Sequence, residues 1–136
     1  LYSGRHKIIA RYRSFHGASY GAMSAGGDPR KIGADTQQAP NFIHVEDPFC
    51  YRCPFGQQFG SCQYECISHI ERVIEFEGPN SIAAILMEGE SGSSGCIKYP
   101  KNYLKKLTLK VEDLLLFLYM HQEKQRMVIL QMNGED

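Results

Sequence analysis

Two sets of side chains in this sequence are of types that could bind a ligand. The first joins Phe15, His16 and Gly17 to Glu88, which opens a loop rich in glycine and serine. Both groups follow apolar, β-rich runs, and parallel α/β sheets bind ligands at the carboxyl ends of their strands. An aromatic ring and a carboxylate in one cleft suit a flat, nitrogen-bearing ligand. The alternative is two unrelated strand ends closed by glycine, with Phe15 an ordinary core aromatic, because motifs this short are weak evidence.

The second set is a group of cysteines in the pattern C-x2-C-x8-C-x3-C, namely Cys50, Cys53, Cys62 and Cys66. Four thiolates at such spacing could hold zinc tetrahedrally, because each pair can chelate from one turn of the chain. The last two are four residues apart, which would place both sulfurs on one face of a helix. The alternative is that the aromatic loop between the pairs folds without metal.

Hydrophobic patterning predicts the elements that would carry these residues. Strands are expected where short β-rich or apolar runs occur, at residues 7–14, 42–45 and 81–87. Helices are expected at residues 17–25, 62–76 and 100–110. The middle helix is the clearest, since Ile67, Ile70 and Ile74 fall on one face. Strands alternating with helices indicate one α/β domain with a mainly parallel sheet.

Composition excludes some classes of function. The 136 residues carry 15 basic and 15 acidic side chains, so no positive field indicates a nucleic acid or an anionic membrane as partner. The longest apolar run, residues 114–120, is too short to span a bilayer. Five cysteines without a secretory signal favour the reduced thiols of a cytoplasmic protein. The first residue is Leu1 and the chain begins in the middle of a pattern, from which we expect a fragment.

Three segments resemble the class III pyridoxal-phosphate aminotransferases, the ω-aminotransferase group of fold type I. They are SGRHKIIARYRSFHGASYGAMSAGGDPRK, DPFCYRCPFG and EGPNSIAAILMEGESGSSGCIKYPKNYLKK, and they occur in the family's order. The likeness covers residues 1 to about 107. It is closest to members that act on ω-amino acids or amines, such as taurine–pyruvate aminotransferase.

The resemblance implies a partial large domain that binds pyridoxal 5'-phosphate. Phe15 matches the aromatic residue that stacks on the pyridine ring, His16 and Gly17 follow it in the family's pattern, and Glu88 matches a glutamate beside the site. The complete enzyme would be a homodimer that transfers an amino group from an amine or ω-amino acid to a 2-oxo acid. Family members not known for zinc share the cysteine loop, which weakens the zinc interpretation.

The sequence departs from the family after the third segment. Leu118, Tyr119 and Met120 stand about where the family has Asp-Glu-Val, whose aspartate pairs with the pyridine nitrogen. No residue matches the Schiff-base lysine, so no catalytic residue is assigned in this chain. We therefore expect residues 108–136 to be a divergent tail, frame-shifted or non-native, and the chain alone to be inactive. The alternatives are a zinc-stabilised binding module that uses the four cysteines, or a non-catalytic interaction subunit.

Overall fold

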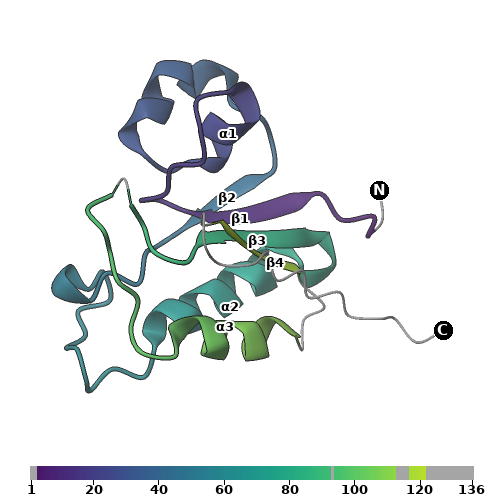
Figure 1. Cartoon of the computed structure of the whole chain (residues 1–136). Helices are drawn as coiled ribbons and strands as arrows, with labels where there is room; N and C mark the ends of the chain where they lie inside the picture. The colour runs from purple at the N-terminus through teal and green to yellow at the C-terminus, as the bar shows by residue number, and fades with distance from the viewer. Residues whose placement is uncertain (1–2, 93, 113–116, 122–136) are drawn as a thin grey trace.

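The protein is built on a four-stranded sheet in which every strand pairing is parallel (Figure 1). The computed structural model describes residues 3–92, 94–112 and 117–121. Its strands are β1 (Lys7–Arg11), β2 (Phe42–Val45), β3 (Ile82–Glu88) and β4 (Phe117–His121), in the order β2-β1-β3-β4. The predicted α/β class with a mainly parallel sheet is confirmed.

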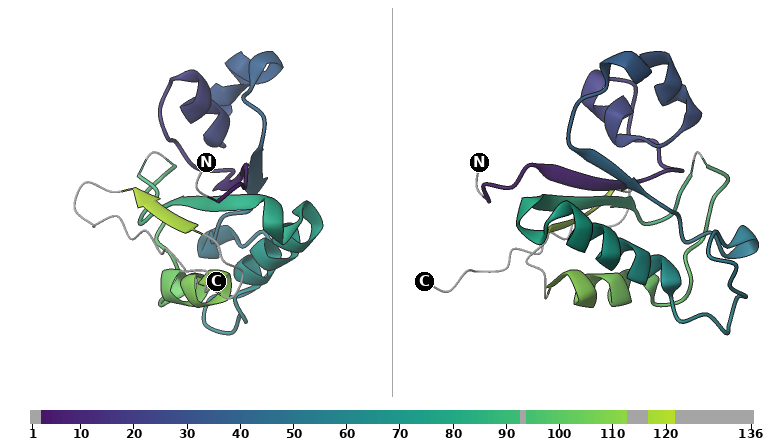
Figure 2. Two further views of the ribbon diagram at one scale, coloured as in Figure 1. Left: turned by 90° about the vertical axis from the view of Figure 1, so that its right-hand side faces the viewer. Right: turned by 180° about the vertical axis from the view of Figure 1, so that it is seen from behind.

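Helices flank the sheet on both sides. Helices α2 (Glu65–Glu77) and α3 (Tyr103–Glu112) lie side by side beneath the strands in Figure 1. The short helix α1 (Tyr20–Ala25) and the 3-10 helix η1 (Pro29–Gln37) lie on the opposite side, as both views in Figure 2 show. Two further 3-10 turns, η2 (Cys50–Arg52) and η3 (Pro79–Ser81), occur in the connections. Among the described helices, none has the length and apolar character needed to cross a bilayer.

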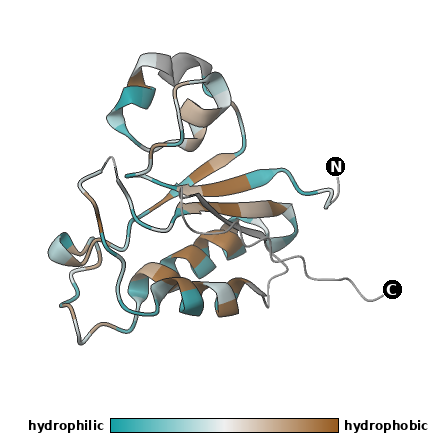
Figure 3. Cartoon of the chain, in the orientation of Figure 1, coloured by the Kyte–Doolittle hydropathy of each residue, from teal (hydrophilic) through white to brown (hydrophobic). Residues whose placement is uncertain are grey.

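The hydrophobic core lies between the sheet and the two helices α2 and α3. The predicted apolar face of α2 is confirmed, because Ile67, Ile70 and Ile74 are all buried. They pack with strand residues such as Ile9 and Ile85 in one cluster that α3 completes. Hydrophobic colouring in Figure 3 accordingly follows the strands and the facing sides of the two helices. This core fixes the strands whose carboxyl ends carry the candidate site.

Several predicted boundaries differ from the structure. The first strand was expected to reach residue 14 but ends at Arg11, where a turn begins. The loop expected after residue 30 contains the 3-10 helix η1. Helix α2 begins at Glu65 rather than at residue 62, because Tyr64 before it adopts a left-handed conformation with φ 63°. Cys62 therefore does not lie on the helix, and the argument that placed it and Cys66 on one helical face is wrong.

The segment expected to pair near the end of the chain is only partly described. Residues 114–116 lie outside the described part of the chain, whereas Phe117 begins β4. β4 pairs in parallel with β3, so that Ala84 lies opposite Phe117 and Glu88 opposite His121. The sheet therefore continues beyond residue 107, into the segment expected to be a divergent tail.

Candidate functional site

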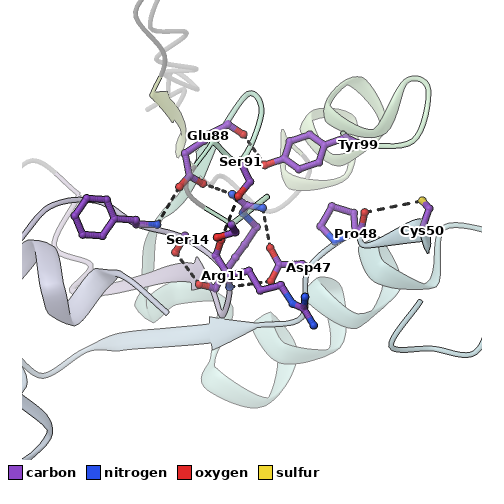
Figure 4. A network of polar contacts seen from close by, with 11 residues as sticks. Arg11, Ser14, Asp47, Pro48, Cys50, Glu88, Ser91 and Tyr99 are labelled. Atoms are coloured by element: carbon purple, nitrogen blue, oxygen red, sulfur yellow. Dashed lines mark hydrogen bonds and ion pairs between the residues drawn. The ribbon is translucent and has the colours of Figure 1, made fainter. Parts of the chain in front are cut away.

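A buried arginine joins the carboxyl ends of three strands (Figure 4). Arg11, the last residue of β1, is fully buried. Its guanidinium donates through Nη1 to Asp47 Oδ1 at 2.8 Å and through Nη2 to Glu88 Oε2. Asp47 follows β2 by two residues, and Glu88 is the last residue of β3. One guanidinium thus holds a carboxyl group at the end of each neighbouring strand.

The same network brings two of the predicted site residues together. Glu88 Oε1 accepts a hydrogen bond from the backbone N–H of Phe15 at 3.3 Å. The carbonyl oxygen of Glu88 accepts from the hydroxyl of Tyr99 at 2.6 Å. The prediction that Phe15 and Glu88 share one edge of the sheet is therefore correct in geometry. His16 and Gly17 follow directly, and Gly17 has φ +129°, a conformation that side chains rarely adopt.

Burial governs the electrostatics of this network. It raises the pKa of Asp47 although Arg11 opposes the shift. Burial also disfavours the charged guanidinium, but interactions with Tyr99, Glu88 and Asp47 outweigh it and leave the pKa of Arg11 raised. The Tyr99 ring lies against the guanidinium, with 5.3 Å between the guanidinium carbon and the ring centroid. These carboxyl groups therefore have a fixed cationic partner within the protein.

The Phe15 ring already has a cationic neighbour. The guanidinium carbon of Arg30 lies 4.0 Å from the ring centroid. Arg30 is itself held by Asp28, which accepts from Nε at 2.6 Å and from Nη2 at 2.8 Å. The hydrogen bonds to Arg30 lower the pKa of Asp28 to about 2. A planar ligand stacking on Phe15 would therefore use the other face of the ring or replace Arg30.

The four patterned cysteines surround one small cavity of about 20 Å³. Burial raises the pKa of Cys66 to about 12 and also raises the pKa of Cys50. Without a metal, such thiols stay protonated at neutral pH. In the described residues, no three histidine, cysteine or acidic side chains form a group that could hold a metal ion.

We expect a chelator to leave the thermal unfolding midpoint of the chain unchanged, because nothing in the cysteine geometry requires a metal. The measurement is a melting curve by circular dichroism with and without excess EDTA. A lowered midpoint together with about one zinc per chain by elemental analysis would support the zinc-stabilised module instead.

The cysteines should also differ in reactivity. In native protein with iodoacetamide, we expect exposed Cys96 to be alkylated first and buried Cys66 last, since the raised pKa keeps Cys66 a thiol. Peptide mass spectrometry over time measures the order. The control is the reaction in urea, where the difference should disappear. Equal native rates for the two would contradict the buried placement of Cys66.

Three residues of the network were not predicted from the sequence: Arg11, Asp47 and Tyr99. One signal pointed to Arg11, because a charged residue directly follows the apolar residues 8–10. A second signal was Glu88, since a carboxylate at the end of a buried strand needs a partner. Asp47 and Tyr99 lie in irregular segments with no periodicity to place them.

Comparison with known proteins identifies the family. A family model described as aminotransferase class-III matches residues 2–117. The leucine/methionine racemase of Thermococcus litoralis is 31% identical over 109 residues, which cover 78% of this chain and 24% of that protein. The uncharacterized aminotransferase YhxA of Bacillus subtilis is 32% identical over 110 residues, covering 81% of this chain and 23% of that protein.

Solved structures agree with the sequence comparisons. The taurine:2-oxoglutarate aminotransferase of Bifidobacterium kashiwanohense, solved with PLP and glutamate, has a TM-score of 0.74 and 32% identity over 87% of this chain and 27% of its own. A thermostable omega transaminase from Pseudomonas jessenii has a TM-score of 0.76 and 27% identity over 84% of this chain and 26% of its own. The chain spans about a quarter of the length of these relatives. It belongs to the class-III aminotransferase family.

Proposed function

We propose that this chain contributes part of the cofactor-binding domain of a pyridoxal 5'-phosphate-dependent aminotransferase. The complete enzyme, a cytoplasmic homodimer, moves an amino group from an amine or ω-amino acid to a 2-oxo acid. The observation that carries the proposal is the hydrogen bond between Glu88 and the backbone of Phe15 at the carboxyl edge of a parallel sheet. Ligands of α/β proteins bind at this edge. A relative with a similar fold was solved with PLP and glutamate, which supports the cofactor assignment.

Each site residue has a role in this proposal. The Phe15 ring would stack on the pyridine ring of the cofactor, because its large flat surface suits a planar partner. His16 and Gly17 continue the turn beside Phe15, and Glu88 would help to hold the cofactor. When bound, the cofactor supplies an electron sink for the substrate carbon. The chain's own residues bind and orient it, and they keep water from one side of it.

We further propose that residues 1–107 form this partial domain and that residues 108–136 are a divergent tail. The tail has no Asp-Glu-Val triplet to pair with a pyridine nitrogen, and Lys124 within it has no family context. The 136 residues alone should therefore show no aminotransferase turnover. A single lysine carrying the cofactor after borohydride reduction, found by peptide mapping, would contradict this.

The cofactor assignment can be tested on the 136-residue chain with 4'-deoxypyridoxine 5'-phosphate, which has the ring and phosphate of the cofactor but no aldehyde to react with surface lysines. Titration into ¹⁵N-labelled protein should shift the backbone amide signals of Phe15, His16 and Gly17. Phe15→Leu should abolish these shifts. Phe76→Leu is the matched control, because Phe76 is 82% exposed on α2 and should change nothing. Shifts that are absent from residues 15–17 of the unmodified chain would overturn the proposal.

A further inference from the structure

We propose that Arg11 is the positioning residue of this site: it fixes the Glu88 carboxylate and, through it, the backbone that presents Phe15. This inference rests on the function proposed above, which assigns Phe15 and Glu88 to the cofactor but gives Arg11 no role. It begins with the two oxygens of Glu88. One accepts from Arg11 Nη2 and the other from the N–H of Phe15. The carboxylate therefore transmits the position of the guanidinium to the residue that carries the aromatic ring.

The guanidinium can act in this way because it is itself immobile. Its second nitrogen is held by Asp47 at 2.8 Å, and the Tyr99 ring lies against it. A guanidinium presents donors in a rigid fork, whereas a lysine ammonium is one point charge on a flexible stem. Only the guanidinium can donate to the carboxyl groups at both neighbouring strand ends while the angle between its two donors stays fixed. Arginine is therefore required at residue 11 for geometry as well as for charge.

The turn between Arg11 and Phe15 is fixed by the same group of residues. The second oxygen of Asp47 accepts from the N–H of Arg13 at 2.9 Å. The hydroxyl of Ser14 donates to the carbonyl of Arg11 at 2.7 Å. With the bond from Phe15 to Glu88, the turn is tied at three successive residues. Of these three hydrogen bonds, the one from Phe15 depends on the orientation of the Glu88 carboxylate, and therefore on Arg11.

The test compares amide hydrogen exchange at two residues of the 136-residue chain. One is Phe15, and the other is Ile8, whose N–H donates to the carbonyl of Asn41 at 2.9 Å near the opposite end of β1. General destabilisation speeds exchange at both amides alike. Loss of the hydrogen bond from Phe15 to a misplaced Glu88 carboxylate speeds exchange at Phe15 alone. In Arg11→Lys we expect the Phe15-to-Ile8 ratio of exchange rates to rise about tenfold, as loss of one hydrogen bond implies.

Two more variants make the result decisive. Glu88→Gln keeps the shape and an acceptor for the Phe15 N–H but removes the ion pair, so the ratio should rise there as well. Phe76→Leu is the control: Phe76 is 82% exposed on α2 and outside the network, so the ratio should stay unchanged. If Arg11→Lys does not fold, Glu88→Gln decides alone. An unchanged ratio in the folded variants among Arg11→Lys and Glu88→Gln would overturn the inference.

The same variants separate this inference from the proposed function. Binding of 4'-deoxypyridoxine 5'-phosphate should weaken in Arg11→Lys and stay unchanged in Phe76→Leu. If the unmodified chain shows no amide shifts with this probe but the exchange ratio still rises, then Arg11 positions Phe15 and the cofactor assignment fails. If the probe shifts residues 15–17 and the ratio stays constant in the variants, the cofactor assignment holds and the role of Arg11 fails.

Discussion

Gly27→Ala should destabilise the chain by about 3 kcal/mol or more, at the upper end of what overpacking does. A Cβ at residue 27 would lie 2.2 Å from the Cα of Tyr12 and 2.3 Å from the carbonyl oxygen of Arg11. Both are backbone atoms, so no side chain can rotate away to make room. The backbone after β1 would have to move, and Arg11 would move with it. Urea unfolding followed by circular dichroism measures the loss.

Gly21→Ala is the matched control for this prediction. Gly21 lies in α1, and a Cβ there would meet nothing within 4 Å. Alanine is the better helix former, so this variant should be as stable as the unmodified chain or up to about 1 kcal/mol more stable. Equal losses in the two variants would show that Gly27 does not pack against the turn after β1.

Arg11→Met is the second substitution with a large expected effect. It replaces the guanidinium with a shorter, uncharged side chain and leaves Asp47 and Glu88 buried without their shared cationic partner. Breaking a buried ion pair from one side destabilises proteins by about 3–5 kcal/mol, because the remaining charge is uncompensated. We expect the free energy of unfolding in urea at neutral pH to fall by this amount.

The control for Arg11→Met is Lys110→Met. The Lys110 ammonium lies 3.0 Å from Glu71, but its side chain is 57% exposed. Exposed pairs contribute only about 0–1 kcal/mol, so the change should be small. A loss in Arg11→Met no larger than that in Lys110→Met would mean that water reaches the network, and the positioning argument would then lose its basis.

Apolar runs predicted which strands form, but local interactions decided where they end. The strand predicted at residues 42–45 is β2 with the same bounds, because its alternating pattern is short and sharply delimited. The first strand was predicted three residues too long, since Tyr12 and Phe15 have β propensity although a turn begins at Tyr12. The start of α2 was missed because a tyrosine in the left-handed region has no recognisable sequence signal.

The candidate site was predictable where it follows strand ends and hidden where it depends on contacts between strands. Phe15 and Glu88 could be placed together because parallel strands end at one edge. Arg11, which holds the Glu88 carboxylate, could not be paired from the sequence, because its partners Asp47 and Glu88 lie 36 and 77 residues away. Gly27 was equally hidden, since only the fold brings it against Tyr12.

Those sequence separations also constrain how the protein can be made on the ribosome. The strand that ends in Arg11 is synthesised 77 residues before its partner Glu88. Until then the guanidinium must stay hydrated, because an unpaired buried charge is strongly unfavourable. The nascent β1 therefore cannot take its buried place in the sheet until β3 has left the exit tunnel. During that interval, its apolar residues Ile8 and Ile9 are available to chaperones.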